Sequence, residues 1–354
     1  MTNHNLFLNT AVKYLLISVL LIFILYFGQT LFIPLFYGLF IALVMYPVCR
    51  WLEKHRFSKP MAIAVALSIV VILFAFLVWL LILQFNALRQ DLPELKEKFA
   101  PSLIESQNWL AANLNISIEA QNDWWQQTAD GLAAKAPGFL SGVLTKTISS
   151  VFMLFIIPVF AALFLYNRKD LVLFFEKLAG EENIIKLHGV LHKTIDTYFD
   201  FIKGMTLVYF MVGILNSIGL LALGIEHAIL FGFLTAIMTI IPYFGIIISA
   251  LLPITVAWIT KDSIWYPLGV IALFAFVQYL EANIIFPRIV GKQLNISTWV
   301  TLAAVIAGGI LWGVSGMILF IPFVAILKLI TDDVPEMEAI NVLLRRNDKI
   351  KKKK

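Results

Sequence analysis

One carboxylate stands out because it lies within a long apolar run. Glu281 follows Gln278 by one helical turn and precedes Asn283, in a run that ends at Pro287 and Arg288. An ionisable group at membrane depth is energetically costly, and it commonly marks a functional site. Because a carboxyl group in a low-dielectric environment can bind and release a proton, Glu281 is a candidate proton or cation site.

The same side chains also allow a purely structural interpretation. Arg288 lies only about 10 Å along the helix from Glu281, at 1.5 Å per residue, so these two residues could form a pair. Gln278 could serve as the partner instead. Gln278 and Asn283 could contact a polar solute or form interhelical hydrogen bonds, as could Asn216 in an earlier apolar run. The candidate ion or substrate pathway therefore comprises Glu281, Gln278, Asn283 and Asn216.

Glycines and prolines interrupt the apolar runs on either side of this carboxylate. A break in a membrane helix leaves backbone N–H and C=O groups that lipid cannot satisfy, so breaks belong in protein interiors or cavities. The spacing of Gly309 and Gly313 also permits close contact between helices. The positions that we interpret as hairpin tips or hinges are Pro242, Gly245, Pro253, Gly308, Gly309, Gly313 and Gly316.

Other chemistries are excluded because residues that they require are missing from the sequence. Gly313-Val314-Ser315-Gly316 could be mistaken for an intramembrane serine protease motif, but no histidine follows His227 to activate the serine. His188 and His192 are four residues apart without a recognised third ligand, so no metal site is predicted. No GxxxxGK[ST] phosphate loop occurs. We expect neither an enzyme nor an ATP-driven transporter, and no cofactor.

Composition indicates a membrane protein. Hydrophobic residues make up 60% of the sequence, against about 45–50% in soluble domains. They form runs long enough for the ~20 residues that span a bilayer. The net charge of +5 lies mainly at the ends of these runs and in the C-terminal tail, and the basic loop from Arg50 to Lys59 is typical of the cytoplasmic side. Membrane orientation therefore explains the basic residues better than nucleic-acid binding does.

The order of apolar and charged stretches divides the chain into six parts. The uncharged run from Tyr14 to Cys49 is long enough for two helices, and we expect it to form a hairpin that turns near Gly28–Pro34. The predicted parts are N-terminal transmembrane helices that act as a scaffold (1–85), an external helical segment (86–145), a transmembrane helix (146–167), cytoplasmic amphipathic helices (168–203), a C-terminal transport unit with two helical hairpins (204–330) and a basic cytoplasmic tail (331–354).

A pattern repeats within the C-terminal unit. A span at Gly204–Ile225 leads into an uncharged run at Ala228–Thr260 that is broken near Pro242, and a span at Ser263–Phe286 leads into a glycine-broken run at Ser297–Leu327. The two halves would have opposite orientations, as in secondary transporters built from inverted repeats. The broken runs are short for two full spans each, which favours re-entrant hairpins over spanning ones. We predict an all-α polytopic membrane protein with about eight transmembrane segments, including the two hairpins.

Short motifs in this region form an ordered series. They are Ile241-Pro242-Tyr243-Phe244-Gly245, Pro253, Asn283 with Pro287-Arg288-Ile289-Val290-Gly291-Lys292, and then Gly308-Gly309, Gly313, Gly316 and Pro322. With these motifs the chain resembles, over nearly all of its length, the autoinducer-2 exporter family of bacterial membrane proteins, also described as PerM-like permeases. Met205, Ile246 and Ser297-Thr298 replace the family's usual residues. These departures concern the substrate more than the fold.

The resemblance implies a multi-pass protein of the bacterial inner membrane with cytoplasmic termini. It also implies a homo-oligomer, a pentamer, in contact with membrane lipids. Family members are linked to export of autoinducer-2 or to sodium–proton antiport. We therefore predict a secondary transporter or exporter of a small molecule or ion, in which Glu281 couples transport to a proton or sodium ion. Two alternatives stay open, a non-transporting membrane scaffold or regulatory protein, and a passive channel.

Overall fold

The computed structural model describes residues 2–114, 117–124, 155–240, 244–261, 263–290, 295–334 and 337–346. Within these ranges the chain is helical with no strand, which confirms the all-α prediction. The elements are α1 (Thr2–Phe27), α2 (Gln29–Lys54), α3 (Lys59–Leu114), α5 (Arg168–Ala179), η1 (Glu181–Asn183), α6 (Ile184–Ala222), α7 (Ala228–Met238), α8 (Phe244–Thr260), α9 (Trp265–Leu280), η2 (Glu281–Ile285), α10 (Phe286–Ile289), α11 (Thr298–Asp333) and α12 (Glu338–Leu344).

Several of these helices are long and apolar enough to cross a bilayer. In the described part of the chain there are five of them, Gln29–Lys54, Lys59–Leu80, Glu181–Ala222, Trp265–Ile289 and Thr298–Asp333. Shorter apolar helices occur at Leu15–Phe27, Phe155–Tyr166, Ala228–Met238 and Gly245–Trp258. The chain is therefore a helical membrane protein. Pro242 and Gly291, and the beginning of the helix predicted at 146–167, lie outside the described residues.

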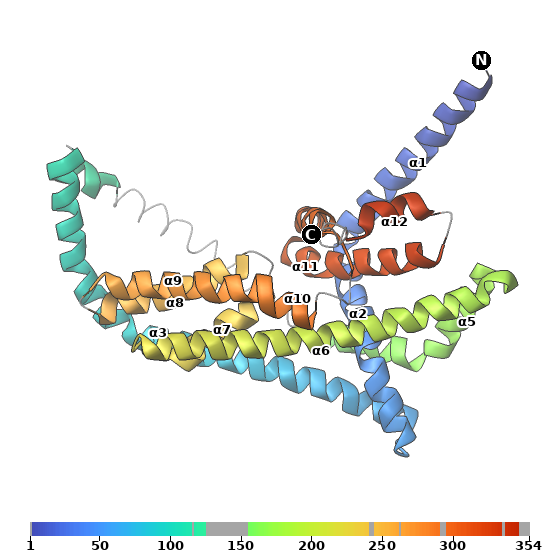
Figure 1. The fold of residues 1–354 in the computed structure, drawn as a ribbon, viewed down its shortest axis with the longest axis horizontal. Helices are drawn as coiled ribbons and strands as arrows, with labels where there is room; N and C mark the ends of the chain where they lie inside the picture. The colour runs from blue at the N-terminus through green and yellow to red at the C-terminus, as the bar shows by residue number, and fades with distance from the viewer. Residues whose placement is uncertain are drawn as a thin grey trace, which may run out of the picture.

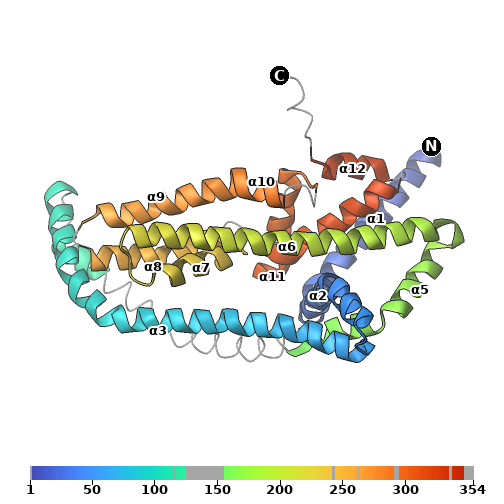
Figure 2. The same ribbon diagram turned by 60° about the horizontal axis from the view of Figure 1, so that its bottom comes forward.

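The long helices form an elongated bundle. Figures 1 and 2 show α3, α6 and α9 running lengthwise, with α7 and α8 beside them, while α2 crosses near one end. Gly38 of α2 lets the helix Phe155–Tyr166 approach closely, because a Cβ atom there would lie 2.5 Å from Phe160 Cβ. Arg168 Nη2 then donates to both carboxylate oxygens of Glu53, at 2.8 and 2.6 Å. This pair joins the C-terminal end of α2 to the start of α5.

Helices α6, α7 and α8 fold back on one another. Ser217 Oγ of α6 donates to Ile229 O of α7 at 3.3 Å, and a Cβ atom at Gly232 would collide with Ser217. Ala228 at the start of α7 packs in one core cluster with Ala257 near the end of α8, so these two helices are antiparallel. They form the hairpin that the sequence predicts between Ala228 and Thr260.

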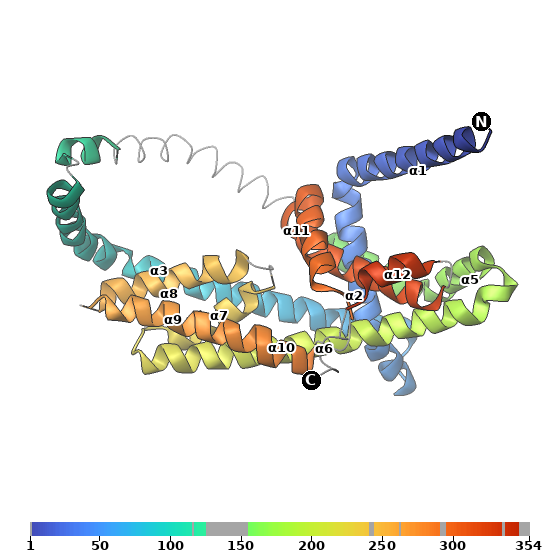
Figure 3. The ribbon, with the colours of Figure 1, turned by 45° about the horizontal axis from the view of Figure 1, so that its top comes forward.

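Helix α11 is not one straight rod. Trp312 (φ −132°, ψ 17°) and Gly313 (φ 59°, ψ −140°) leave the helical conformation in its middle. Beyond them the chain turns back, so that a Cβ atom at Gly316 would lie 1.9 Å from the carbonyl oxygen of Gly308. Figure 3 shows the bent α11 beside α2, and Trp312 Nε1 donates to Leu25 O of α1 at 2.9 Å. The tip of this second hairpin thus rests on the junction of α1 and α2.

The C-terminal segment closes the base of the α11 hairpin. The backbone N–H of Ser297 donates to Leu344 O at 2.8 Å, and Asn341 Nδ2 donates to Asp332 Oδ1 at 2.7 Å. Lys328 is buried and pairs with Asp332. This network connects α12 to both ends of the hairpin.

Two of the predicted boundaries, at 85/86 and 203/204, fall inside helices, whereas α5 begins at the predicted boundary, Arg168. Helix α3 continues through residue 85 to Leu114, and α6 runs from Ile184 through residue 204 without interruption. At these two boundaries, Phe85–Asn86 and Lys203–Gly204 contain no sequence that ends a helix, so each helix continues through them. The division into an external segment, cytoplasmic helices and a transport unit remains a prediction.

Candidate functional site

Glu281 lies where the helix that began as α9 changes its winding. The five residues of η2 form a π-helical turn, and the N–H of Phe286 donates to Glu281 O, five residues back. Pro287 follows at the start of α10 and has no N–H to continue the regular pattern. Single π-turns inside α-helices occur frequently at functional sites. The wider turn therefore marks the helix segment that presents Glu281.

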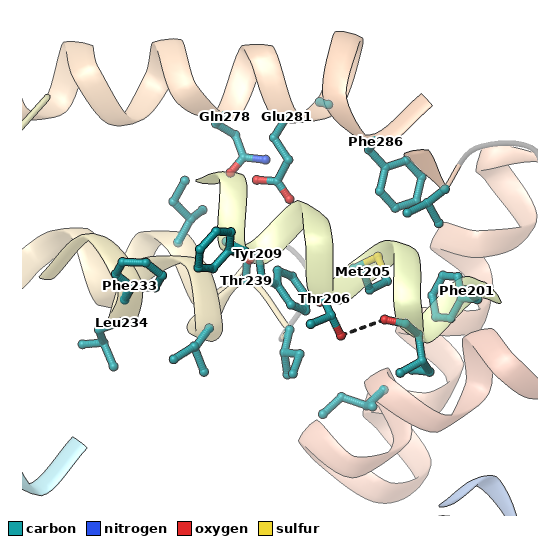
Figure 4. Close-up of a pocket in the computed structure, with 18 of the residues that line it drawn as sticks. Phe201, Met205, Thr206, Tyr209, Phe233, Leu234, Thr239, Gln278, Glu281 and Phe286 are labelled. Carbon is teal, nitrogen blue, oxygen red and sulfur yellow. Dashed lines mark hydrogen bonds between the residues drawn. The ribbon is translucent and has the colours of Figure 1, made fainter. Parts of the chain in front are cut away.

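The Glu281 side chain is buried beside the half-buried Gln278. Glu281 is 8% exposed, and Figure 4 shows its carboxyl group and the Gln278 amide pointing toward each other and toward α6, with Tyr209 nearby. Glu281 Oε2 and Gln278 Oε1 are buried without a hydrogen-bond partner in the described structure. Because a buried acceptor without a donor costs about 1–3 kcal/mol, the pair is suited to receive donors from a solute or proton carrier.

A groove of about 1740 Å³ runs past this pair. Its described lining comes from α3, α6, α7, α8, α9, α10 and α11 and is mostly apolar, with residues such as Leu73, Phe233 and Leu319. Thr206 and Thr239 also line it, but their hydroxyl groups donate to backbone carbonyls of their own helices, at 2.9 and 2.6 Å. The hydrogen atoms of these two hydroxyl groups are thus engaged, whereas Glu281 Oε2 and Gln278 Oε1 are buried acceptors without a donor in the described structure.

The structure does not support an ion pair between Glu281 and Arg288. Arg288 is exposed, and none of the ion pairs formed among the described residues includes Glu281. The alternative structural partner, Gln278, does interact with it. No group of three His, Cys, Asp or Glu side chains in the described chain could hold a metal ion.

The other predicted pathway residues lie elsewhere. Asn283 is exposed and donates from Nδ2 to Tyr279 O of its own helix at 3.0 Å. Asn216 is 1% exposed in α6 and does not line the groove, although its Oδ1 has no hydrogen-bond partner in the described structure. The structure brings together Gln278 and Glu281, and the assignment of the four residues to one pathway stays a prediction.

The predicted hinge residues have different surroundings. Gly245 begins the second arm of the α7–α8 hairpin, where a Cβ atom would lie 1.6 Å from Met238 O. Pro253 is inside α8. Gly308 and Gly316 pack against each other, Gly309 faces the Met317 side chain, and Gly313 forms the turn.

Sequence reasoning missed two features of the site. Tyr209 of α6 faces the Glu281 pair (Figure 4), and residues of α3 from Leu73 to Leu80 contribute to the groove. Both belong to ordinary apolar runs without a distinguishing motif. Only the packing of α3 and α6 around the hairpins places them there.

Comparison with known proteins gives matches over most of the chain. Residues 15–336 match the model of a family described as AI-2E family transporter. The chain is 28% identical over 307 residues to the Bacillus subtilis protein named “Putative transport protein YrrI”, with 85% of each chain covered. It is 23% identical over 318 residues to the AI-2 transport protein TqsA of Escherichia coli K12, with 90% of each covered. YhhT of the same strain is 24% identical over 297 residues, which cover 84% of this chain and 83% of YhhT.

Proposed function

The chain belongs to the AI-2E transporter family, and on that basis we propose that it is a secondary transporter that exports a small solute across the bacterial inner membrane. In this proposal the movement is coupled to a proton or sodium gradient through Glu281. An autoinducer-2-like molecule is one candidate solute, because the relative TqsA is named an AI-2 transport protein.

The observation that carries the proposal is the buried Glu281 beside a large groove. Its Oε2 atom has no hydrogen-bond partner within the described residues, and no described cation neutralises it. A scaffold protein gains nothing from such a group, since burying an uncompensated carboxyl group is costly. A transporter can use it to exchange a proton, an ion or a polar solute.

We propose that both hairpins are re-entrant and belong to an inverted repeat within about eight membrane segments. The first arm of the α11 hairpin, Thr298–Leu311, spans only about 21 Å at 1.5 Å per residue, which is less than the ~30 Å hydrocarbon core. Thr239, at the tip of the α7–α8 hairpin, lines the groove. Movement of this C-terminal unit against α1 and α2 would change access to Glu281.

The proposed orientation places both chain termini in the cytoplasm. The Glu53–Arg168 pair supports it, because it joins two segments whose charges both indicate the cytoplasmic side. In a Cys49→Ala background, a membrane-impermeant maleimide added to intact cells should label Glu226→Cys, in the loop between α6 and α7. It should not label Lys186→Cys until the cells are opened. The reverse pattern would invert the topology.

A homo-oligomer, pentameric by family resemblance, is also part of the proposal. Between Val12 and Phe27, helix α1 exposes apolar side chains, among them Leu15, Leu20 and Phe27, and α1 makes close backbone approaches only to α2 and α11 among the described elements. A second copy or lipid would cover this surface. Mass measurement of the protein in nanodiscs distinguishes an oligomer from a lipid-covered monomer.

Transport is tested with purified protein in liposomes that contain a pH-sensitive dye. A proton or sodium gradient is imposed, and wild type is compared with Glu281→Gln and with Glu226→Gln as a control for the same chemical change at an exposed site. We expect gradient-dependent flux in wild type and in Glu226→Gln, and loss of this flux in Glu281→Gln. Flux that needs no gradient would indicate a channel. The absence of flux in all three correctly folded proteins, with autoinducer-2 also tested, would favour the scaffold alternative.

A further inference from the structure

We infer that the groove takes an amphiphilic organic cation, an amine with an apolar body whose ammonium group donates to Glu281 and Gln278. This inference rests on the proposed transport function and names the chemical class of its solute. It follows from three properties of the site, namely the kind of polar atoms offered, their charge, and the surface around them.

The site offers two buried acceptors beside Glu281, and the hydroxyl near them that is not engaged with a backbone carbonyl is that of Tyr209. Glu281 Oε2 and Gln278 Oε1 are both buried acceptor atoms without a partner in the described structure. The neighbouring hydroxyl donors of Thr206 and Thr239 are engaged with backbone carbonyls. A ligand that satisfies this pair must therefore supply at least two N–H or O–H donors from one small group. A primary ammonium group has three such donors.

The charge of the site favours a cation over a neutral alcohol. Glu281 is the one acidic side chain among the described lining residues, and no described ion pair neutralises it. The basic residues that line the same groove are His227, in the α6–α7 loop, and Arg346, after α12. A buried charge is tolerated when an opposite charge and hydrogen bonds compensate it, so an ammonium group and Glu281 would stabilise each other.

The groove surface on both sides of this pair suits an apolar body. Figure 4 shows Phe201, Tyr209, Phe233 and Phe286 around the helix segment that faces Glu281 and Gln278, and all four line the groove. Aromatic faces attract ammonium groups, and they also pack against hydrocarbon. A strongly hydrated solute would lose its water on entering this surface without recovering equivalent hydrogen bonds. An amine with an aromatic or aliphatic body would place its hydrocarbon part against this surface, while its ammonium group recovers hydrogen bonds at Glu281 and Gln278.

The inference is tested by direct binding to the full-length protein in nanodiscs of phosphatidylcholine and phosphatidylglycerol. The probes are radiolabelled 2-phenylethylammonium, 2-phenylethanol and 3-phenylpropionate, which share a ring and differ in the charge of the end group. Equilibrium dialysis measures their binding, and empty nanodiscs correct for partition into lipid. We expect saturable binding of the amine, at least about tenfold tighter than that of the alcohol, and no binding of the acid.

Variants locate the binding site. Glu281→Gln should weaken amine binding about 10- to 100-fold, because it removes a charge-assisted hydrogen bond. Gln278→Leu should weaken it several-fold, and Glu226→Gln should leave it unchanged. Thermal unfolding of each variant establishes that it is folded. If Glu281→Gln does not fold and Gln278→Leu does, the affinity of Gln278→Leu for the amine tests whether the amine binds at this pair.

Three results would overturn the inference. Equal binding of the three probes would show that charge is not recognised, and undiminished binding to Glu281→Gln would place the amine elsewhere. Competition by phosphatidylethanolamine added to the nanodiscs would assign the site to a lipid ammonium group instead of a free solute. The inference and the proposed function fail separately. Glu281-dependent ion flux without amine binding would leave the transporter standing, and amine binding without any flux would leave a binding site without transport.

Discussion

The contact between two glycines makes the hairpin in α11 directly testable. A Cβ atom at Gly316 would lie 1.9 Å from Gly308 O and 2.5 Å from Gly308 C. Because real Cβ contacts do not fall below 3.0 Å, the two arms would have to separate by roughly 1 Å in Gly316→Ala. Backbone atoms cannot rotate away as a side-chain end can, so the arms must move as units.

The cost of this separation can be estimated. Overpacking a well-packed interior costs about 1–3 kcal/mol, and replacing glycine with alanine in a helix returns about 0.5–1 kcal/mol of helix propensity. We therefore expect Gly316→Ala to lower the free energy of unfolding by about 1–2 kcal/mol. The melting temperature should fall by a few degrees.

Two other glycines provide matched controls. A Cβ atom at Gly309 would meet the flexible end of Met317, with Cε at 2.8 Å, and one at Gly189 of α6 would meet nothing within 4 Å. Gly309→Ala should thus be close to neutral, and Gly189→Ala slightly stabilising. Thermal unfolding of the four proteins in one detergent, followed by tryptophan fluorescence, gives the comparison. If Gly316→Ala melts with the two controls, the arms of α11 are not packed as described and the hairpin reasoning is refuted.

Three further predictions concern the same tip and the Glu53–Arg168 pair. Gly313→Ala should lower stability by about 1–3 kcal/mol through backbone strain alone, because Gly313 has φ 59° and no atom near its Cβ position; thermal unfolding measures it. Trp312→Phe keeps an aromatic ring but loses the 2.9 Å bond to Leu25 O, so stability should fall by about 1 kcal/mol, and an unchanged melting temperature would contradict the contact. Arg168→Met and Glu53→Gln should each destabilise the protein, and a double-mutant cycle should give a coupling energy of about 1–2 kcal/mol. Partial exposure of the two side chains, 15% and 21%, limits this value. Strictly additive effects would refute the ion pair.

Much of the helical layout could be predicted from the distribution of charges. The uncharged run from Tyr14 to Cys49 indicates a hairpin of two helices that turns near Gly28–Pro34. In the structure α1 ends at Phe27 and α2 begins at Gln29, as the break predicts, but α1 leads away from α2 instead of folding back on it (Figures 1 and 3). The break predicted near Pro242 lies between Met238 and Phe244, where α7 ends and α8 begins. Long apolar runs and their interruptions are strong local signals, and tertiary packing does not override them.

The roles of individual residues within these runs could not be predicted. Four glycines interrupt the last run, but only backbone geometry shows that Gly313 makes the turn while Gly308 and Gly316 make the contact. The π-turn at Glu281 has no sequence signal beyond Pro287. The orientation of an amide side chain also depends on packing. Asn283 is close to Glu281 in sequence, but its amide donates to a carbonyl group of its own helix.

Helix α6 is one continuous helix that connects the segment around Lys193 to the groove wall at Tyr209. Its 39 residues extend for about 58 Å, nearly twice the ~30 Å hydrocarbon core. One end carries Lys193, which binds Asp333 at 2.7 Å, and Tyr209 lies about 24 Å further along at 1.5 Å per residue, beside Glu281. A helix of this kind acts as a lever. In the proposed mechanism, a partner protein that binds the end of α6 near Lys193, or a change of charge there, tilts the wall of the groove without entering the membrane.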